Sequence, residues 1–121
     1  MISTTSIQSG VKLLAKSMEQ SADELNTADG QLGDGDLGVS MIQGFRDILD
    51  ILDSLPEDIG MAIYECAKAL TKSSGSSFGT LMATGMMAVA KVKKGHNIIE
   101  LEEVSRLFDI ALEAMQNRGK A

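Results

Sequence analysis

Three aspartates and four glycines lie close together in "LNTADGQLGDGDLG", residues 25–38. The carboxylates of Asp29, Asp34 and Asp36 repel one another at such short spacing, and a bound cation would turn that repulsion into attraction. Carboxylate oxygens are the ligands that Mg²⁺, Mn²⁺ and Ca²⁺ prefer, whereas Zn²⁺ and Cu²⁺ favour His and Cys, which this stretch lacks. The acidic stretch is therefore a candidate site for a divalent cation.

The same residues allow other interpretations. Asp and Gly are ordinary loop residues, because Asp side chains mimic backbone turns and glycines permit them. An EF-hand Ca²⁺ loop is disfavoured, since the spacing "DGQLGDGD" does not follow the alternate-position ligand pattern and no Glu stands at the closing position. On residue types alone, a metal site and an empty, solvated loop both stay open.

A second candidate is the serine-rich stretch "SSGSSFG", residues 73–79, which stands where a helix is expected to begin. Exposed N–H groups at a helix N-terminus attract anions, and small residues let a phosphate come close. Such a stretch is also a common N-cap. Together with a carboxylate site of the Mg²⁺ type, it favours a nucleotide, because metal ions and helix N-termini act jointly on phosphates in phosphoryl transfer.

Apolar residues recur at whole helical turns in five segments, which predicts five helices to position these two stretches. The residues expected to face inward are Ile7, Val11, Leu14, Met18 and Leu25; then Val39, Ile42, Phe45, Leu49 and Leu52; then Ile59, Ile63, Cys66 and Leu70; then Phe78, Leu81, Met82, Gly85, Met86 and Val89; and last Leu101, Val104, Leu107, Phe108, Ala111, Leu112 and Met115.

The boundaries of these helices follow from caps and glycines. The acidic stretch is expected to be a loop after the first helix, and the second helix begins at about Gly38. Asp58 is a candidate N-cap of the third helix, which ends near Thr71. The turn "KKGHN", with its surface residue His96, ends the fourth helix, and Gly119 is the expected stop of the fifth.

Composition supports an all-α fold. The chain has 121 residues, 44% of them hydrophobic but only 3% aromatic, with eight Met and one Pro. Unbranched, soft side chains of this kind fill helical interiors rather than sheets. Because the expected loops are short, neighbouring helices should pack antiparallel as an up-and-down bundle, with residues 1–121 forming a single domain.

Charge and cysteine content exclude several classes of partner. A net charge of −6 repels a phosphate backbone, so nucleic acid is not expected to bind. No apolar run is long enough for a membrane span, and the N-terminus lacks the order of a signal peptide. The single Cys66 allows no internal disulfide and is expected to be buried. These features favour the cytoplasm.

Three sequence landmarks resemble those of a known family. "LNTADGQLGDGDLGVSM", "SSGSSFGT" and the closing "NRGKA" are similar, in order and separation, to landmarks of the L subunit of dihydroxyacetone kinase, the nucleotide-binding subunit called DhaL. The likeness spans nearly the whole chain, and its most specific element is the Asp-x4-Gly-Asp-x-Asp-x-Gly pattern. It implies an antiparallel barrel of eight helices with the nucleotide, ATP or ADP, at one end.

The resemblance also implies roles for particular residues. Asp29, Asp34 and Asp36 would coordinate two Mg²⁺ ions that bridge the nucleotide phosphates. The residues that would lie against the nucleotide are Leu37, Gly38 and Ser40 at the start of the second helix, Ser73, Ser74 and Gly75 before the fourth, and Gly119. A separate K-type subunit would hold dihydroxyacetone or a related small ketose. ATP, or a phosphotransferase-system protein acting on bound ADP, would supply the phosphoryl group.

The chain departs from the family pattern in three places. Leu37 stands where the family usually has His, and Thr71 and Lys72 stand where Gly-Gly is common, Lys72 being expected on the surface. The family sequence continues past "RGKA", whereas this chain stops at Ala121. A barrel truncated in this way would leave apolar stripes uncovered, which predicts self-association or a partner chain.

Two further functions stay open at this point. A regulatory or interaction module could keep the fold without the activity, as Leu37 and the shorter chain would allow. A simple Ca²⁺-binding helical protein would bind Ca²⁺ more tightly than Mg²⁺ without nucleotide.

Overall fold

The computed structural model describes the backbone of residues 1–32, 37–72 and 77–119. Within these ranges, the side chains of residues 22, 23, 25, 26, 28–32, 37–40 and 77 are outside the description.

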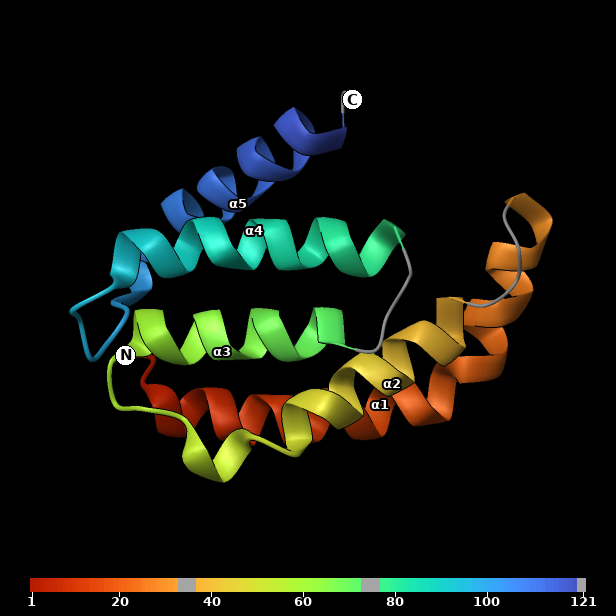
Figure 1. Cartoon of the computed structure of the whole chain (residues 1–121), viewed down its shortest axis with the longest axis horizontal. Helices are drawn as coiled ribbons and strands as arrows, with labels where there is room; N and C mark the ends of the chain where they lie inside the picture. The colour runs from red at the N-terminus through yellow and green to blue at the C-terminus, as the bar shows by residue number, and fades with distance from the viewer. Residues whose placement is uncertain (33–36, 73–76, 120–121) are drawn as a thin grey trace.

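Five α-helices make up nearly all of the described chain (Figure 1). They are α1 (Thr4–Leu32), α2 (Leu37–Leu49), α3 (Ile59–Lys72), α4 (Ser77–Lys93) and α5 (Val104–Gly119), with 3₁₀ turns η1 (Leu52–Ser54) and η2 (Leu101–Glu103) before α3 and α5. Each helix packs against the next one along the chain, and successive helices run in opposite directions. The predicted all-α, up-and-down bundle is confirmed.

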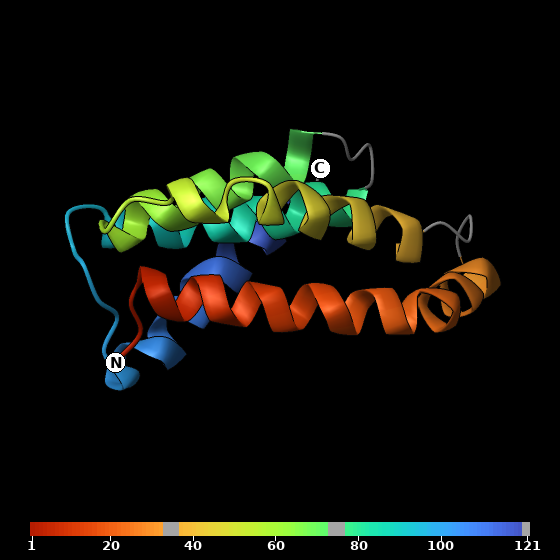
Figure 2. The same ribbon diagram turned by 90° about the horizontal axis from the view of Figure 1, so that it is seen from below.

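The helices do not form a flat layer. Figure 2 shows α1 and the start of α5 on one side of the helices α2, α3 and α4. An antiparallel bridge between Ile2 and Ile99, with both N–H···O distances at 2.8 Å, ties the start of the chain to the segment before α5. Two backbone hydrogen bonds therefore hold the start of the chain against the segment before α5.

The core consists of two clusters of buried apolar side chains. The larger one is formed by residues of α1, α2, η1, α3 and α4. Its buried members are Ala15, Met41, Phe45, Ile48, Leu52, Cys66, Ala67, Ala69, Leu70 and Ala83. The smaller one, at the bridged end, contains Ile59, Ile99 and Leu107. Most of the predicted inward positions of α2 and α3 are confirmed. Burial raises the pKa of the Cys66 thiol to about 11, with Glu65 adding to the shift, so this buried cysteine stays protonated and unreactive.

The first helix is longer than the sequence predicts. It continues to Leu32 and so includes Asp29 and Gly30, which were expected to lie in a loop. A single glycine within a helix costs about 1 kcal/mol relative to alanine, which the rest of a 29-residue helix can tolerate. Leu25, Ala28 and Leu32 also continue the helical spacing of apolar residues. The number of glycines in this stretch thus wrongly predicted that the loop begins before Asp29.

Some apolar residues predicted to face inward lie at the surface. Leu14 on α1, Phe78 on α4, and Leu101, Phe108 and Leu112 around α5 are exposed. The reason is clearest in α5, which packs mainly against α4 and so buries one face alone. Its opposite face has no partner among the described helices, in line with the predicted uncovered stripes.

Asp58 fastens the start of α3 to the turn after α4. Its Oδ1 accepts the N–H of Met61 at 3.0 Å, which confirms the predicted N-cap, and its Oδ2 accepts the N–H of Gly95 at 2.8 Å. Gly95 has a φ of +92°, a conformation that favours glycine. These hydrogen bonds, led by that of Met61, hold the pKa of Asp58 below its ordinary value.

We therefore expect Asp58 to make the protein sensitive to acid. A carboxylate with a lowered pKa in the folded state stabilises the protein above its unfolded-state pKa, and this contribution is lost as the pH falls through the folded-state value. Asp58→Asn should lower the free energy of unfolding at neutral pH, and the loss should shrink at about pH 3. Urea unfolding at both pH values measures this.

The control for this experiment is Asp50→Asn, because Asp50 is exposed and makes no described side-chain hydrogen bond. It should leave stability at neutral pH unchanged. An equal loss of stability at both pH values for Asp58→Asn would contradict the predicted linkage.

A partly buried ion pair fixes the start of α5. The Lys93 side chain is only 6% exposed, and its Nζ lies 2.8 Å from Oε1 of Glu103. Glu103 and Glu100 also form a capping box around η2. The hydrogen bond from Lys93, followed by that from the Glu100 N–H, lowers the pKa of Glu103. The end of α4 and the start of α5 are thus joined by charge as well as by packing.

Candidate functional site

The two candidate stretches adjoin the same end of the bundle. α1 and α3 end there, and α2 and α4 begin there, as Figure 1 shows. The acidic stretch spans the end of α1 and the start of α2, and the serine-rich stretch precedes and begins α4. The alternation of helix direction therefore brings two segments that are distant in the sequence to one end.

The predicted metal ligands are described only in part. Asp29 lies in the last turns of α1, although its side chain is outside the description. Asp34 and Asp36 lie outside the described residues. Their roles as ligands stay a prediction.

The residues predicted to contact the nucleotide are also described only in part. Leu37, Gly38 and Ser40 form the first turn of α2, and only their backbone is described. Ser73, Ser74 and Gly75 lie outside the described residues.

Gly119 is fully described and ends α5, as predicted. It is exposed, and a Cβ placed on it would meet one neighbour, Cδ2 of Leu81, at 3.9 Å. Because Leu81 lies in the second turn of α4, this contact brings the end of α5 beside the beginning of α4. Gly119 therefore belongs to the same end of the bundle as the other candidates.

The electrostatics of this end suit an anion. α2 and α4 both begin here, and neither has an acidic residue in its first turn. The N-terminus of a helix carries a partial positive charge and unpaired N–H groups. Lys72, exposed as predicted, adds a formal positive charge in the last turn of α3. An anion at this end would thus find positive partners on neighbouring helices.

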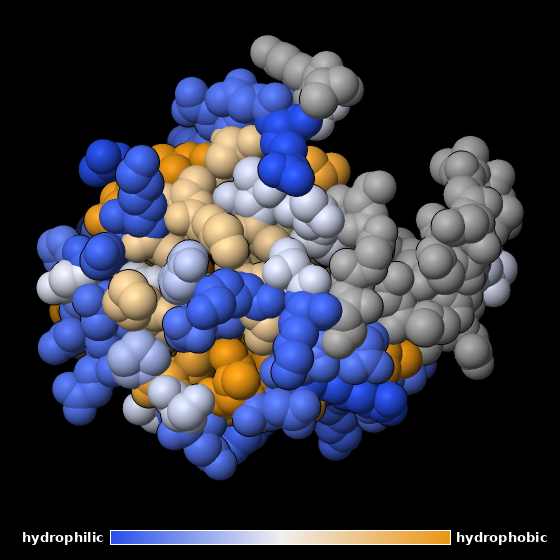
Figure 3. Space-filling model, in the orientation of Figure 1, coloured by the Kyte–Doolittle hydropathy of each residue, from blue (hydrophilic) through white to orange (hydrophobic). Residues whose placement is uncertain are grey.

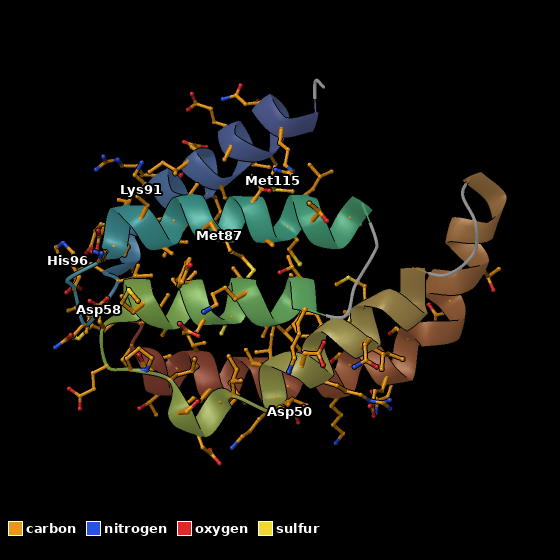
Figure 4. The ribbon with its side chains drawn as sticks, viewed as in Figure 1. Asp50, Asp58, Met87, Lys91, His96 and Met115 are labelled. Carbon is orange, nitrogen blue, oxygen red and sulfur yellow. The ribbon has the colours of Figure 1, made fainter. Side chains whose placement is uncertain are left out.

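The opposite end has a different character. Figure 4 shows Asp58 and His96 close together there, at the turn between α4 and α5. The His96 side chain is exposed, while its backbone oxygen accepts the N–H of Ile59 at 2.7 Å. His96 therefore lies far from the acidic stretch, which agrees with its prediction as a surface residue.

One buried carboxylate was missed by the sequence analysis. Asp47 on α2 is 9% exposed, its Oδ1 accepts a hydrogen bond from Nε2 of Gln43 at 3.1 Å, and its Oδ2 has no described partner. The i, i+4 spacing of Gln43 and Asp47 was the available signal. Within the described residues no group of three His, Cys, Asp or Glu side chains could hold a metal ion.

Comparison with known proteins gives a consistent result. The family model of the DAK2 domain matches residues 31–121. The chain is 29% identical over 98 residues to the ADP-binding subunit DhaL of the PEP-dependent dihydroxyacetone kinase of Escherichia coli K12, covering 80% of this chain and 47% of that protein. It is 32% identical to the PTS-dependent DhaL subunit of Lactococcus lactis, covering 80% and 48%.

A third relative extends the match slightly. The DhaL subunit of the PEP-dependent dihydroxyacetone kinase 2 of Listeria innocua is 28% identical over 107 residues, covering 86% of this chain and 50% of that protein. The chain thus spans about half the length of these three relatives. None of the described helices has the length and apolar character needed to cross a membrane.

Proposed function

The chain belongs to the DAK2 domain family, and from this premise we propose that it is a Mg²⁺-dependent ATP- or ADP-binding subunit of a dihydroxyacetone kinase-like system. Residues 1–121 act as one nucleotide-binding domain, in phosphoryl transfer to dihydroxyacetone or a related small ketose. The observation that carries the proposal is the position of the acidic stretch and the serine-rich stretch at the same end of the bundle. The three DhaL relatives described above are ADP-binding subunits, which does not favour a purely regulatory module.

The residues at this end are chemically suited to a magnesium nucleotide. Asp29, Asp34 and Asp36 supply the hard oxygen ligands that Mg²⁺ requires, and two bound ions would neutralise the phosphate oxygens. The N-termini of α2 and α4 lack acidic residues in their first turns, so their N–H groups suit phosphate oxygens. The acidic stretch thus suits the Mg²⁺ ions, and the positive N-termini of the two helices suit the phosphates.

Most of the residues that would lie near the phosphates are small. Gly38 and Ser40 in the first turn of α2, with Ser73, Ser74 and Gly75 before α4, allow close approach of the ligand. Leu37 cannot donate the hydrogen bond that a histidine would supply there. At this position, backbone N–H groups rather than a side chain therefore bind the nucleotide.

A subunit of this kind requires partners. The relatives' names place them in PEP-dependent or PTS-dependent kinases. We propose a K-type subunit that holds the ketose and, in a phosphotransferase-linked system, a protein that rephosphorylates bound ADP. Self-association or a further chain covers the exposed apolar faces. The proposal includes a cytoplasmic setting, because the single buried Cys66 leaves no disulfide that would require an oxidising compartment.

Calorimetric titration tests the nucleotide site directly. ADP and ATP are titrated into the purified chain with Mg²⁺, with Ca²⁺ and with EDTA. We expect binding with Mg²⁺ and at least about tenfold weaker binding in EDTA, because the phosphates would then meet unscreened carboxylates. Equal affinity with and without metal would contradict the assignment, and tight Ca²⁺ binding without nucleotide would favour a calcium protein instead.

A further inference from the structure

A groove runs between the outer faces of α3 and α4. Its volume is about 450 Å³, and it is lined by Met61, Tyr64, Met87, Ala90, Lys91 and Lys94. These residues belong to the first turns of α3, the last turns of α4 and, for Lys94, the turn that follows α4, so the groove lies toward the end with Asp58 and His96. It is therefore separate from the candidate nucleotide site at the other end.

The floor of the groove is apolar and its rim is basic. Figure 3 shows apolar residues gathered over α3 and α4 on this face, with hydrophilic residues around them. Lys91 and Lys94 are exposed, and neither forms an ion pair with a described residue. Lys68 extends the rim, with its Nζ 5.3 Å from the centre of the Tyr64 ring and 3.7 Å from Oε1 of Glu65, so its charge is partly compensated. In a chain with a net charge of −6, this concentration of lysines is a local exception.

The outer face of α5, together with the preceding turn η2, has the complementary character. Leu101, Phe108 and Leu112 are 67%, 65% and 53% exposed, which makes a stripe of unpartnered apolar side chains. Each is followed directly in the sequence by an exposed acidic residue: Glu102, Asp109 and Glu113. None of these three acids forms an ion pair with a described residue, and the exposed Arg106 is the one basic residue between them, so the stripe is flanked by a net negative charge.

We propose that the outer face of α5 of a second copy of this chain docks in the groove between α3 and α4. Phe108 and Leu112 lie one turn apart, about 6 Å along the helix, and the groove follows α4 from Met87 to Lys94, about 10 Å. Two apolar side chains on consecutive turns therefore fit its length. The same contact brings Asp109 and Glu113 toward Lys91 and Lys94.

Charge complementarity is what identifies the occupant. A helix in an apolar groove gains from burial of its apolar face, and opposite charges at the rim set its orientation. Neither surface has a partner among the described residues of one copy, and a single kind of contact between copies covers both of them. The inference concerns the opposite end of the bundle and does not depend on nucleotide binding.

A charge-exchange experiment tests this contact. One variant carries Lys91→Glu and Lys94→Glu, and the other carries Asp109→Lys and Glu113→Lys. In each variant alone, groove and helix have the same charge, so association should be lost. In a mixture, the acidic groove of the Lys91→Glu, Lys94→Glu variant can bind the basic helix of the other variant. The unchanged basic groove of that other variant can bind the unchanged acidic helix of the first. Association should therefore return only on mixing.

Light scattering during gel filtration, over a range of concentrations, measures the mass. The wild-type chain should exceed its 12.8 kDa monomer mass, and each variant alone should remain at that mass. Lys72→Glu, which changes an exposed lysine at the other end, should associate like the wild type. Circular dichroism of each variant establishes that it is folded.

Three results would overturn the proposal. The wild-type chain could remain at 12.8 kDa at every concentration. The charge variants could associate as strongly as the wild type, which would place the contact elsewhere. The folded variants could fail to associate when mixed, which would show that groove and helix do not meet.

Discussion

Gly60→Ala is expected to lower the free energy of unfolding by about 3 kcal/mol, the upper part of the range for overpacked interiors. Gly60 is buried in the first turn of α3, where it faces the end of α4. A Cβ at this position would clash with the N of Lys94, and it would lie 2.5 Å from the C of Lys93 and 2.6 Å from the Cα of Lys94. All three atoms are backbone, so no side-chain rotation can relieve the clash.

The clash would spread to neighbouring contacts. Moving the start of α3 away from α4 pulls on the hydrogen bond from the Gly95 N–H to Asp58, at 2.8 Å, and on that from the Ile59 N–H to the His96 oxygen, at 2.7 Å. Buried hydrogen-bonding groups that lose their partners add their own cost. The expected loss therefore includes both steric strain and weakened bonds.

Gly10→Ala is the matched control for this prediction. Gly10 lies within α1, and a Cβ there would have nothing within 4 Å. Replacing an unneeded helical glycine should raise stability by about 0.5–1 kcal/mol, because alanine loses less backbone entropy on folding. Urea unfolding followed by circular dichroism measures both variants. If Gly60→Ala unfolded at the wild-type urea concentration, the close approach of α3 and α4 would be disproved.

These two glycines illustrate which features a sequence can reveal. Helical periodicity predicts the order of the five helices and the inward positions of α3, since each helix can be recognised from its own residues. Gly10 and Gly60 look alike in the sequence, because both interrupt a helical pattern. Only the packing of α3 against α4 distinguishes them, and that contact joins residues distant in the chain.

The candidate site shows the same division. Residue chemistry identified the acidic and serine-rich stretches, and the alternation of helices places them at one end. The extension of α1 through Asp29 was missed, because several glycines favoured a loop while the helix tolerates Gly30. The exposed Phe108 and Leu112 were predicted to be inward, since periodicity marks an apolar face but does not show which neighbour covers it.

Asp34→Ala is expected to weaken the Mg²⁺-dependent binding of ADP by about 100-fold or more, since loss of even an outer-sphere partner of a bound metal costs 10–100-fold. Asp34 stands between Asp29 and Asp36 in the sequence. Without it, the two remaining aspartates are not close neighbours in the sequence. Calorimetric titration measures the affinity. Asp53→Asn, which changes an exposed carboxylate in η1, is the control and should bind ADP like the wild type.

The effect of this substitution on stability should depend on the ligand. Without metal, Asp34→Ala removes like-charge repulsion of about 1 kcal/mol, so the variant should be as stable as the wild type or more so. With Mg²⁺ and ADP at about 100 times the dissociation constant, binding should stabilise the wild type by about 2.7 kcal/mol, and the variant should lose nearly all of that gain. Thermal unfolding in EDTA and in Mg²⁺-ADP separates the two effects. A variant that is less stable than the wild type in EDTA would assign the Asp34 side chain to the fold, and wild-type affinity for ADP would remove it from the metal site.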